Sequence, residues 1–257
     1  THTVAPHDIL IRHIGERSVT PYETLQKAAD PAHCIHIAYV AEGYKEAEMS
    51  TFIEDCRTAM EALFAHEPFK SLRQRFNIVA VKSPSVESGT SEPSKGIWKN
   101  TALHSHFDTF YSDRYLTTLH LKDLHDWLAG TPYEHIIVLV NTEKYGGGGI
   151  LNSYNLSMAH HAYFKPVVVH EFGHSFAGLG DEYAYDQEQI SMYPTDVEPW
   201  EPNLTTLVDF HGKWEKLIDK KTPLPTPQPS DLDKPNARRD KWKVGAYEPA
   251  GYSQHGV

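Results

Sequence analysis

Two histidines stand four residues apart, with a glutamate directly after the first, in the segment VVVHEFGHSFAGLGDEY, residues 167–183. On a helix this spacing places His170 and His174 on one face, about 6 Å apart along the axis, so both can bind one ion. Zn²⁺ accepts imidazole nitrogen, and a catalytic zinc site has three protein ligands and one open position for water. Glu171 lies beside that face, where its carboxylate can take a proton from the attacking water. The pattern predicts metal-assisted hydrolysis.

The third ligand does not follow the longer pattern HExxHxxGxxH, because Ala177 and Gly180 occupy its glycine and last histidine positions. Glycines at 178 and 180 instead allow the helix to end and the chain to reverse. Asp181 and Glu182 follow at once, so the turn bears a carboxylate. We predict Asp181 as the third ligand, with Glu182 as the alternative.

A second histidine pattern offers a competing hypothesis. His104, His106 and Asp108, in HSHFD, fit the HxHxD start of two-metal hydrolases, although no strong strand pattern precedes them. The alternative functions are therefore a two-metal hydrolase that uses this segment, or a non-catalytic binding module that retains a metal. The intact Glu171 argues against the binding module, because binding alone needs no base.

Hydrophobic periodicity predicts the elements that must position these residues. Strands are expected at 34–40, 75–81 and 134–141, and helices at about 49–64 and 119–129. This alternation favours an α/β (α+β) fold with a mostly parallel, twisted sheet and helical crossovers. The glycine run in YGGGGI, residues 145–150, predicts a sharp turn into an extended edge segment at 150–158. After about residue 178 we expect a smaller irregular lobe, including a polyproline-like stretch at 222–235.

Composition excludes some partners. The 34 acidic and 24 basic residues give a net charge of −10, which argues against nucleic acid or an anionic membrane as the main partner. No stretch approaches the roughly 20 apolar residues of a membrane span. Cys34 and Cys56 lack metal or redox spacing and are predicted to be buried thiols, with a disulfide between them left open. The chain begins without methionine, which suggests a fragment or a processed form, and its oligomeric state is not encoded in any pattern.

The segment HEFGHSFAGLGDEY resembles the active-site signature of the IgA-peptidase-type zinc metallopeptidases, a bacterial family related to the metzincins. Four further segments are similar to that family: AYVAEGYKEAEMSTF, SHFDTFYSDRYL, VLVNTEKYGGGGI and EPNLTTLVDFHGKW. The resemblance implies zinc ligands at His170, His174 and Asp181 and a catalytic base at Glu171. It also implies a zincin sheet with an antiparallel edge strand, and a secreted or cell-envelope protein.

Together these inferences predict a single metallopeptidase catalytic domain over residues 1–257, with an upper lobe at 1–178 and a lower, irregular lobe at 179–257. The predicted function is a zinc-dependent endopeptidase that holds an extended polypeptide substrate by strand addition, at the segment 150–158. The methionine turn of such enzymes is expected beyond Val257, with Met192 as the alternative. Tyr252 is a further candidate for stabilising the oxyanion.

Overall fold

The computed structural model describes residues 5, 7–9, 18–182, 194, 196–230 and 242–247. The chain divides into two compact units, Thr1–Ala177 and Gly178–Val257. The candidates Met192 and Tyr252 lie outside the described residues. The first unit contains β1 (Tyr22–Gln26), β2 (Ile35–Glu42), α1 (Met49–Leu63), β3 (Phe76–Val81), α2 (Leu121–Trp127), β4 (His135–Val140), β5 (Gly147–Ile150), β6 (Tyr154–Met158) and α3 (Phe164–Ala177).

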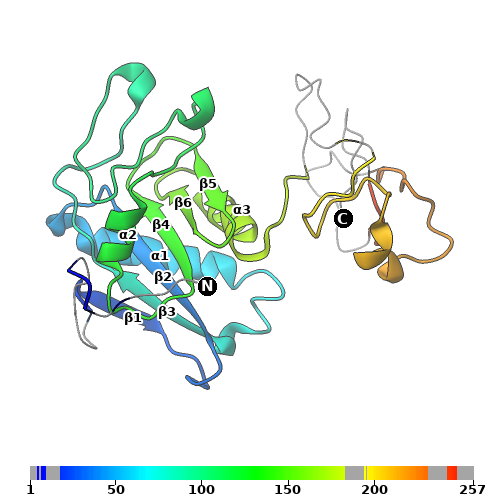
Figure 1. Cartoon of the computed structure of the whole chain (residues 1–257), viewed down its shortest axis with the longest axis horizontal. Coiled ribbons are helices and arrows are strands. Elements are labelled where there is room, and N and C mark those ends of the chain that lie inside the picture. Colours follow the sequence, from blue (N-terminus) through cyan, green and yellow to red (C-terminus); the bar gives the residue numbers. More distant parts are fainter. Residues whose placement is uncertain are drawn as a thin grey trace. The chain divides into compact units, whose positions relative to one another are not determined.

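The first unit is built on a mixed six-stranded sheet with the order β1-β3-β2-β4-β6-β5 (Figure 1). The four inner strands β3, β2, β4 and β6 are parallel to one another. The edge strands β1 and β5 pair antiparallel to β3 and β6. The prediction of a mostly parallel sheet with an antiparallel edge strand is therefore confirmed, and β1 adds a second antiparallel edge that was not predicted.

Strand β2 shows how the sheet is buried on both faces. Ile37 and Tyr39 belong to one core cluster, which also contains residues of α1 and α3. Ala38 and Val40 belong to the other cluster, which contains Leu124 of α2 and several loop residues. Successive side chains of a strand point to opposite faces, so a strand covered on both sides reads as a continuous apolar run. This explains why the pattern at 34–40 predicted a buried strand.

Helix α1 confirms the predicted helix near residues 49–64. Its apolar positions recur every three or four residues and pack on the sheet, and Phe52 and Cys56 are fully buried. Both cysteines are free thiols, and Cys34 is only partly buried. The predicted thiols are therefore confirmed, with the correction that Cys34 retains some exposure.

The predicted edge segment at 150–158 is wrong in its placement. Strand β5 ends at Ile150, residues 151–153 form a turn, and β6 lies between β4 and β5. The edge of the sheet is therefore the glycine strand β5 itself, and β6 is an interior strand. The prediction failed because four successive glycines suggest a turn when only local conformational freedom is considered.

The second unit has a small core of its own. Phe210 packs edge-on against Trp214, with ring centroids 4.6 Å apart, and Ala246 completes the buried cluster. Phe210 begins the first of two short 3-10 turns, Phe210–Gly212, and Trp214 directly precedes the second, Glu215–Leu217. In the described parts of both units, no helix has the length and apolar character that a membrane crossing requires.

Candidate metal centre

Helix α3 bears the histidine motif and is fixed to the sheet by its opposite face. Val168 and Phe172 are buried in the core that α3 shares with α1. Phe176, one turn further on, contacts Phe69 and the ring of His135 at centroid distances of 5.6 Å and 4.6 Å. These apolar contacts fix the orientation of the helix about its axis, so that His170 and His174 lie on its more accessible side.

The two predicted histidine ligands face each other. Their Nε2 atoms are 3.0 Å apart, and their rings are nearly perpendicular, at 86°. Two nitrogens bound to one tetrahedral zinc, each at 2.0–2.1 Å from the ion, lie about 3.3 Å from each other. The spacing of His170 and His174 therefore fits a shared zinc ion with only a small adjustment.

Strand β5 lies directly against the face of α3 that bears the motif. A Cβ atom built on Gly147 would lie 2.6 Å from Oε1 of Glu171. A Cβ atom on Gly149 would lie 2.5 Å from the backbone oxygen of Glu171 and 2.8 Å from Cβ of His174. Real Cβ atoms do not approach other atoms this closely, so the strand needs glycine to accommodate the helix.

The other face of β5 is equally close to a loop. A Cβ atom on Gly146 would lie 2.4 Å from the backbone oxygen of Arg114, and one on Gly148 would lie 2.7 Å from that of Leu116. The run of glycines therefore alternates between two neighbours with the two-residue period of a strand. It is a site of close approach on both faces, which corrects its interpretation as a turn.

The outer edge of β5 is already paired at Gly147. Its backbone oxygen accepts a hydrogen bond from the Leu116 N–H at 3.1 Å, and its N–H donates to the Arg114 oxygen at 3.2 Å. Backbone groups of residues two apart along a strand point to the same side. Gly149 therefore presents its backbone N–H and C=O along this same edge, beyond the paired position.

Asp181 follows the end of α3 by four residues and belongs to the second unit. Gly178 adopts a left-handed φ of +64°, which agrees with the predicted end of the helix at a glycine. Asp181 lies between Gly180 and Glu182, both of which form hydrogen bonds with Asn203. Its role as third ligand stays a prediction.

Asn203 holds the segment that bears both candidate third ligands, and sequence reasoning did not predict this role. Its Oδ1 accepts the Gly180 N–H at 2.8 Å, and its Nδ2 donates to the Gly180 backbone oxygen at 2.9 Å. The same Nδ2 donates to Oε1 of Glu182 at 2.7 Å, so one oxygen of the alternative ligand is engaged. The available signal was its position in EPNLTTLVDFHGKW, one of the family-like segments.

Lys213 in turn organises the loop that contains Asn203. Its side chain is 13% exposed and pairs with Glu198, at 2.9 Å between Nζ and Oε1. Its Nζ also donates to three backbone oxygens of that loop, those of Pro199, Glu201 and Leu204. An ammonium group with four acceptors in one loop fixes the path of the backbone there.

The competing HxHxD arrangement at 104–108 is not formed. The Nδ1 atom of His106 lies 2.7 Å from the backbone oxygen of Phe107, and Oδ2 of Asp108 accepts the Ser94 N–H at 2.8 Å. Among the described residues, no group of three potential metal ligands includes His106 or Asp108. The two-metal alternative therefore gains no support from the structure.

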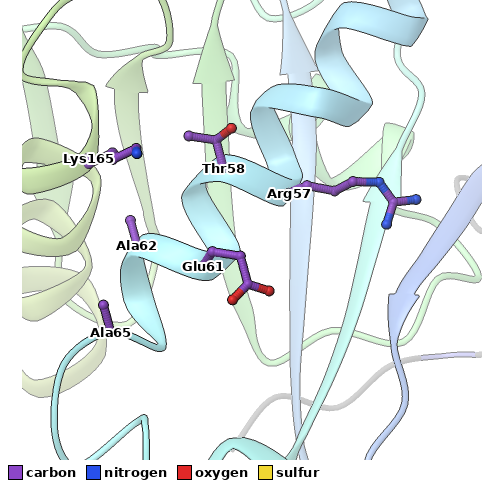
Figure 2. A pocket seen from close by; sticks show the side chains of 6 residues that line it. All are labelled: Arg57, Thr58, Glu61, Ala62, Ala65 and Lys165. Carbon is purple, nitrogen blue, oxygen red and sulfur yellow. The ribbon is translucent and has the colours of Figure 1, made fainter.

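A surface pocket of about 420 Å³ lies where α1 meets the first turn of α3 (Figure 2). Its charged lining residues are Arg57, Glu61 and Lys165. Arg57 is paired with Glu23, and Glu61 with Arg73. None of the predicted site residues lines this pocket, so it is separate from the candidate metal centre.

Comparison with known proteins supplies the family. No curated protein matches the chain. The family model described as IgA Peptidase M64 matches residues 24–244, which include His170, Glu171, His174 and Asp181. The M64 peptidases are metallopeptidases, which agrees with the facing histidines on α3 and with a polypeptide substrate. The chain therefore belongs to the IgA peptidase M64 family, as the resemblance of its motifs predicted.

Proposed function

We propose that this peptidase is a zinc-dependent endopeptidase in which His170, His174 and Asp181 hold the metal and Glu171 is the general base. The observation that supports this most directly is the 3.0 Å separation of the two Nε2 atoms on adjacent turns of α3. Two imidazoles and one carboxylate are a common donor set for catalytic zinc. The proposal includes a zincin-type fold, because an antiparallel edge strand packs against the helix that bears the motif.

The chain's own residues supply the proton transfer. When bound, the zinc ion polarises the carbonyl group of the substrate and makes water a stronger nucleophile. Glu171, whose carboxylate lies against Gly147, takes a proton from the attacking water at a carboxylate oxygen. It then gives that proton to the nitrogen of the departing amine as the C–N bond breaks.

The substrate is proposed to be an extended polypeptide that adds to β5 as a further strand. Because the segment 114–116 already pairs at Gly147, the addition begins beyond that residue, at the backbone groups of Gly149. There the scissile bond would pass beside the part of α3 that bears Glu171 and His174. The expected export to the cell envelope or exterior is independent of these contacts and stays a prediction.

The experiment compares zinc content and hydrolysis of a fluorescently labelled unfolded protein in the wild type and four variants. Glu171→Gln should keep the wild-type zinc content but lose at least about 100-fold in rate, because its side chain cannot accept the proton. His170→Ala and Asp181→Ala should each lower the zinc content by one ion per chain. Glu143→Gln, at an exposed carboxylate in the loop before β5, is the matched control and should change neither quantity.

Two results would contradict the proposal. If Glu171→Gln hydrolysed the substrate at the wild-type rate, Glu171 would not be the general base. An unchanged zinc content in His170→Ala would show that the metal is held elsewhere. If only Asp181→Ala retains its zinc, the third ligand is reassigned, and Glu182→Ala then becomes the deciding variant.

A further inference from the structure

Three potential metal ligands meet at a second place in the first unit. One ligand atom each from His104, His120 and Asp123 lies within 4.8 Å of the other two. The rings of His104 and His120 have centroids 4.5 Å apart, and Nδ1 of His120 lies 2.9 Å from Oδ2 of Asp123. We propose that these three side chains bind a divalent transition-metal ion such as zinc, which joins the two ends of the loop 104–120.

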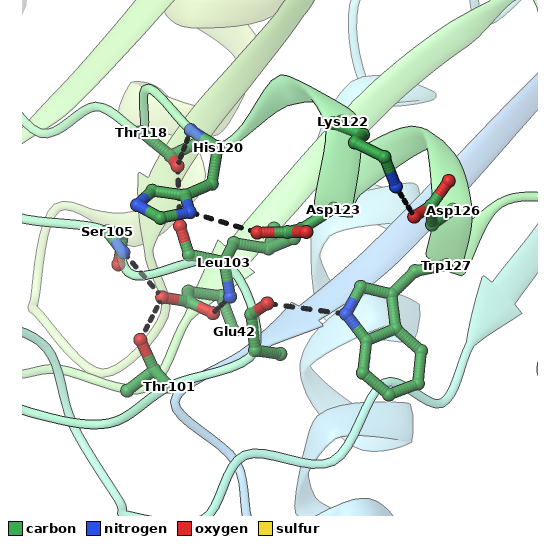
Figure 3. Close-up of polar contacts among 11 residues, drawn as sticks. Glu42, Thr101, Leu103, Ser105, Thr118, His120, Lys122, Asp123, Asp126 and Trp127 are labelled. Atoms are coloured by element: carbon green, nitrogen blue, oxygen red, sulfur yellow. Dashed lines mark hydrogen bonds and ion pairs between the residues drawn. The ribbon is translucent and has the colours of Figure 1, made fainter. Parts of the chain in front are cut away.

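The backbone on both sides of His104 is fixed by a buried carboxylate. Glu42 is fully buried at the end of β2 and accepts three hydrogen bonds (Figure 3). The donors are the Thr101 hydroxyl at 2.6 Å, the Leu103 N–H at 2.8 Å and the Ser105 N–H at 2.8 Å. Three donors compensate for the burial of this charge. The position of His104 is therefore set from the core rather than by the exposed surface.

His104 itself has a left-handed backbone, with φ at +49°. Non-glycine residues occupy this region rarely, and such conformations persist where the surrounding structure imposes them. The two hydrogen bonds from Leu103 and Ser105 to Glu42 impose it here. The result is that the imidazole of His104 lies against that of His120.

A second anchor connects the two ends of the loop. The Thr118 hydroxyl donates to the backbone oxygen of Leu103 and accepts the N–H of His120 at 3.0 Å. Figure 3 shows these bonds beside the contact between His120 and Asp123 in the first turn of α2. The two histidines are therefore placed by a connected set of polar contacts, which is what a metal site requires of its surroundings.

The donor set indicates the class of metal. Imidazole nitrogen suits zinc, copper, nickel and cobalt, whereas magnesium and calcium prefer oxygen ligands. His104 and His120 are exposed and Asp123 is partly exposed, so water can complete the coordination. The site uses no residue of α3. Of the three residues in the HxHxD hypothesis, it includes only His104.

The position of the site suggests what the ion does. Inside the loop, His106 and Thr117 exchange two backbone hydrogen bonds of 3.0 Å and 3.1 Å. Between them, Arg114 and Leu116 pair with Gly147 of β5. A metal ion bound to both His104 and His120 would cross-link the two ends of this loop. The cross-link reduces the conformational entropy that the loop gains when it detaches from the sheet. The ion would thus hold the segment 114–116 against the edge of the sheet.

The binding test uses the full chain with both α3 histidines replaced, His170→Ala/His174→Ala, so that the proposed catalytic ion cannot contribute. Equilibrium dialysis against zinc, followed by elemental analysis, should give one ion per chain. Adding His104→Asn should weaken that binding at least tenfold, and Asn tolerates the left-handed backbone. His33→Ala is the matched control, because His33 forms a similar exposed pair with Asp30 at 3.0 Å but belongs to no group of three potential ligands among the described residues.

Equal zinc binding with and without His104→Asn would overturn the site. The role in the loop has its own readout, since Phe110 and Tyr111 are almost fully exposed and chymotrypsin cleaves after such residues. Zinc should slow cleavage there several-fold in the double variant and have no effect once His104→Asn is added. Zinc binding without any slowing would overturn the closing of the loop. Because the background lacks both α3 histidines, neither result depends on the proposed catalytic function.

Discussion

Gly149 of β5 lies directly against His174 of α3, where a Cβ atom added to the glycine would come within 2.8 Å of the Cβ of the histidine. The strand and the helix are thus in backbone-to-backbone contact at the candidate metal centre. No flexible side chain lies between them to absorb a change. The positions of His174 and Glu171 are therefore sensitive to the size of the residue at 149.

The first prediction follows from this contact. Gly149→Ala should displace α3, because the new methyl group would meet the Glu171 backbone oxygen at 2.5 Å. We expect zinc affinity to fall about tenfold or more, as it does when the support of a ligand is altered. Competition with a chelating dye measures this. Gly212→Ala is the control, since a Cβ atom there meets nothing within 4 Å, and equal zinc affinities of the two variants would refute the prediction.

A second prediction concerns Asn203. Asn203→Asp keeps the shape of the side chain but removes the donor that holds the Gly180 oxygen and the Glu182 carboxylate. It also places a second carboxyl group beside that of Glu182, so the segment that bears Asp181 should rearrange. We expect zinc affinity to fall about tenfold, while Asn100→Asp, at an exposed position, leaves it unchanged. Wild-type affinity in Asn203→Asp would show that Asn203 does not position the ligand.

Lys213 carries a prediction about stability. Lys213→Met leaves Glu198, whose side chain is 14% exposed, without its cation, and removes the donor from three backbone oxygens. Breaking a mostly buried pair on one side costs about 3 kcal/mol. Urea unfolding monitored by tryptophan fluorescence should therefore show that the second unit of the variant unfolds at a lower urea concentration than that of the wild type. Lys216→Met, on an exposed lysine, should match the wild type, and the same behaviour of Lys213→Met would contradict this role.

A pH dependence is expected from His135 in β4. Burial lowers the pKa of His135 below its ordinary value of 6.5, and nearby Glu134 opposes this only in part. The unfolded chain therefore binds a proton at higher pH than the folded chain does, and stability decreases as pH falls from about 6.5 toward the lowered folded-state pKa. The measurement is made with a chelator present, so that loss of metal at low pH does not contribute. The free energy of unfolding of His135→Phe should then fall less with decreasing pH than that of the wild type, whereas His66→Phe should behave like the wild type. Parallel pH profiles for wild type and His135→Phe would rule out the contribution.

The elements predicted correctly are those whose own residues determine their burial. Strands β2, β3 and β4 are apolar runs enclosed on both faces, and α1 has a regular apolar stripe. Strand β1 was missed because its sequence, YETLQ, is short, largely polar and partly exposed at the edge of the sheet. The spacing of His170 and His174 was informative because both lie on one helix, where spacing fixes geometry.

The parts that escaped prediction depend on contacts between distant segments. Strand β5 is glycine-rich because α3 lies against one of its faces and the loop 114–116 against the other, and neither neighbour is visible in the local sequence. His104 was grouped with His106 because the two are close in sequence, whereas its partners in space are His120 and Asp123. That grouping depends on how Glu42 and Thr118 hold the loop, which spacing alone does not reveal.

The close approach of neighbours to both faces of β5 also bears on how this region can evolve. An ordinary edge strand has a buried face and an open face, so every second position accepts many residues. At each position from Gly146 to Gly149, an added Cβ atom would lie within 3.0 Å of another atom. None of the four positions therefore has open space for a side chain. Saturation mutagenesis should therefore show an unbroken block of four intolerant codons where a two-residue alternation of tolerance is normally expected.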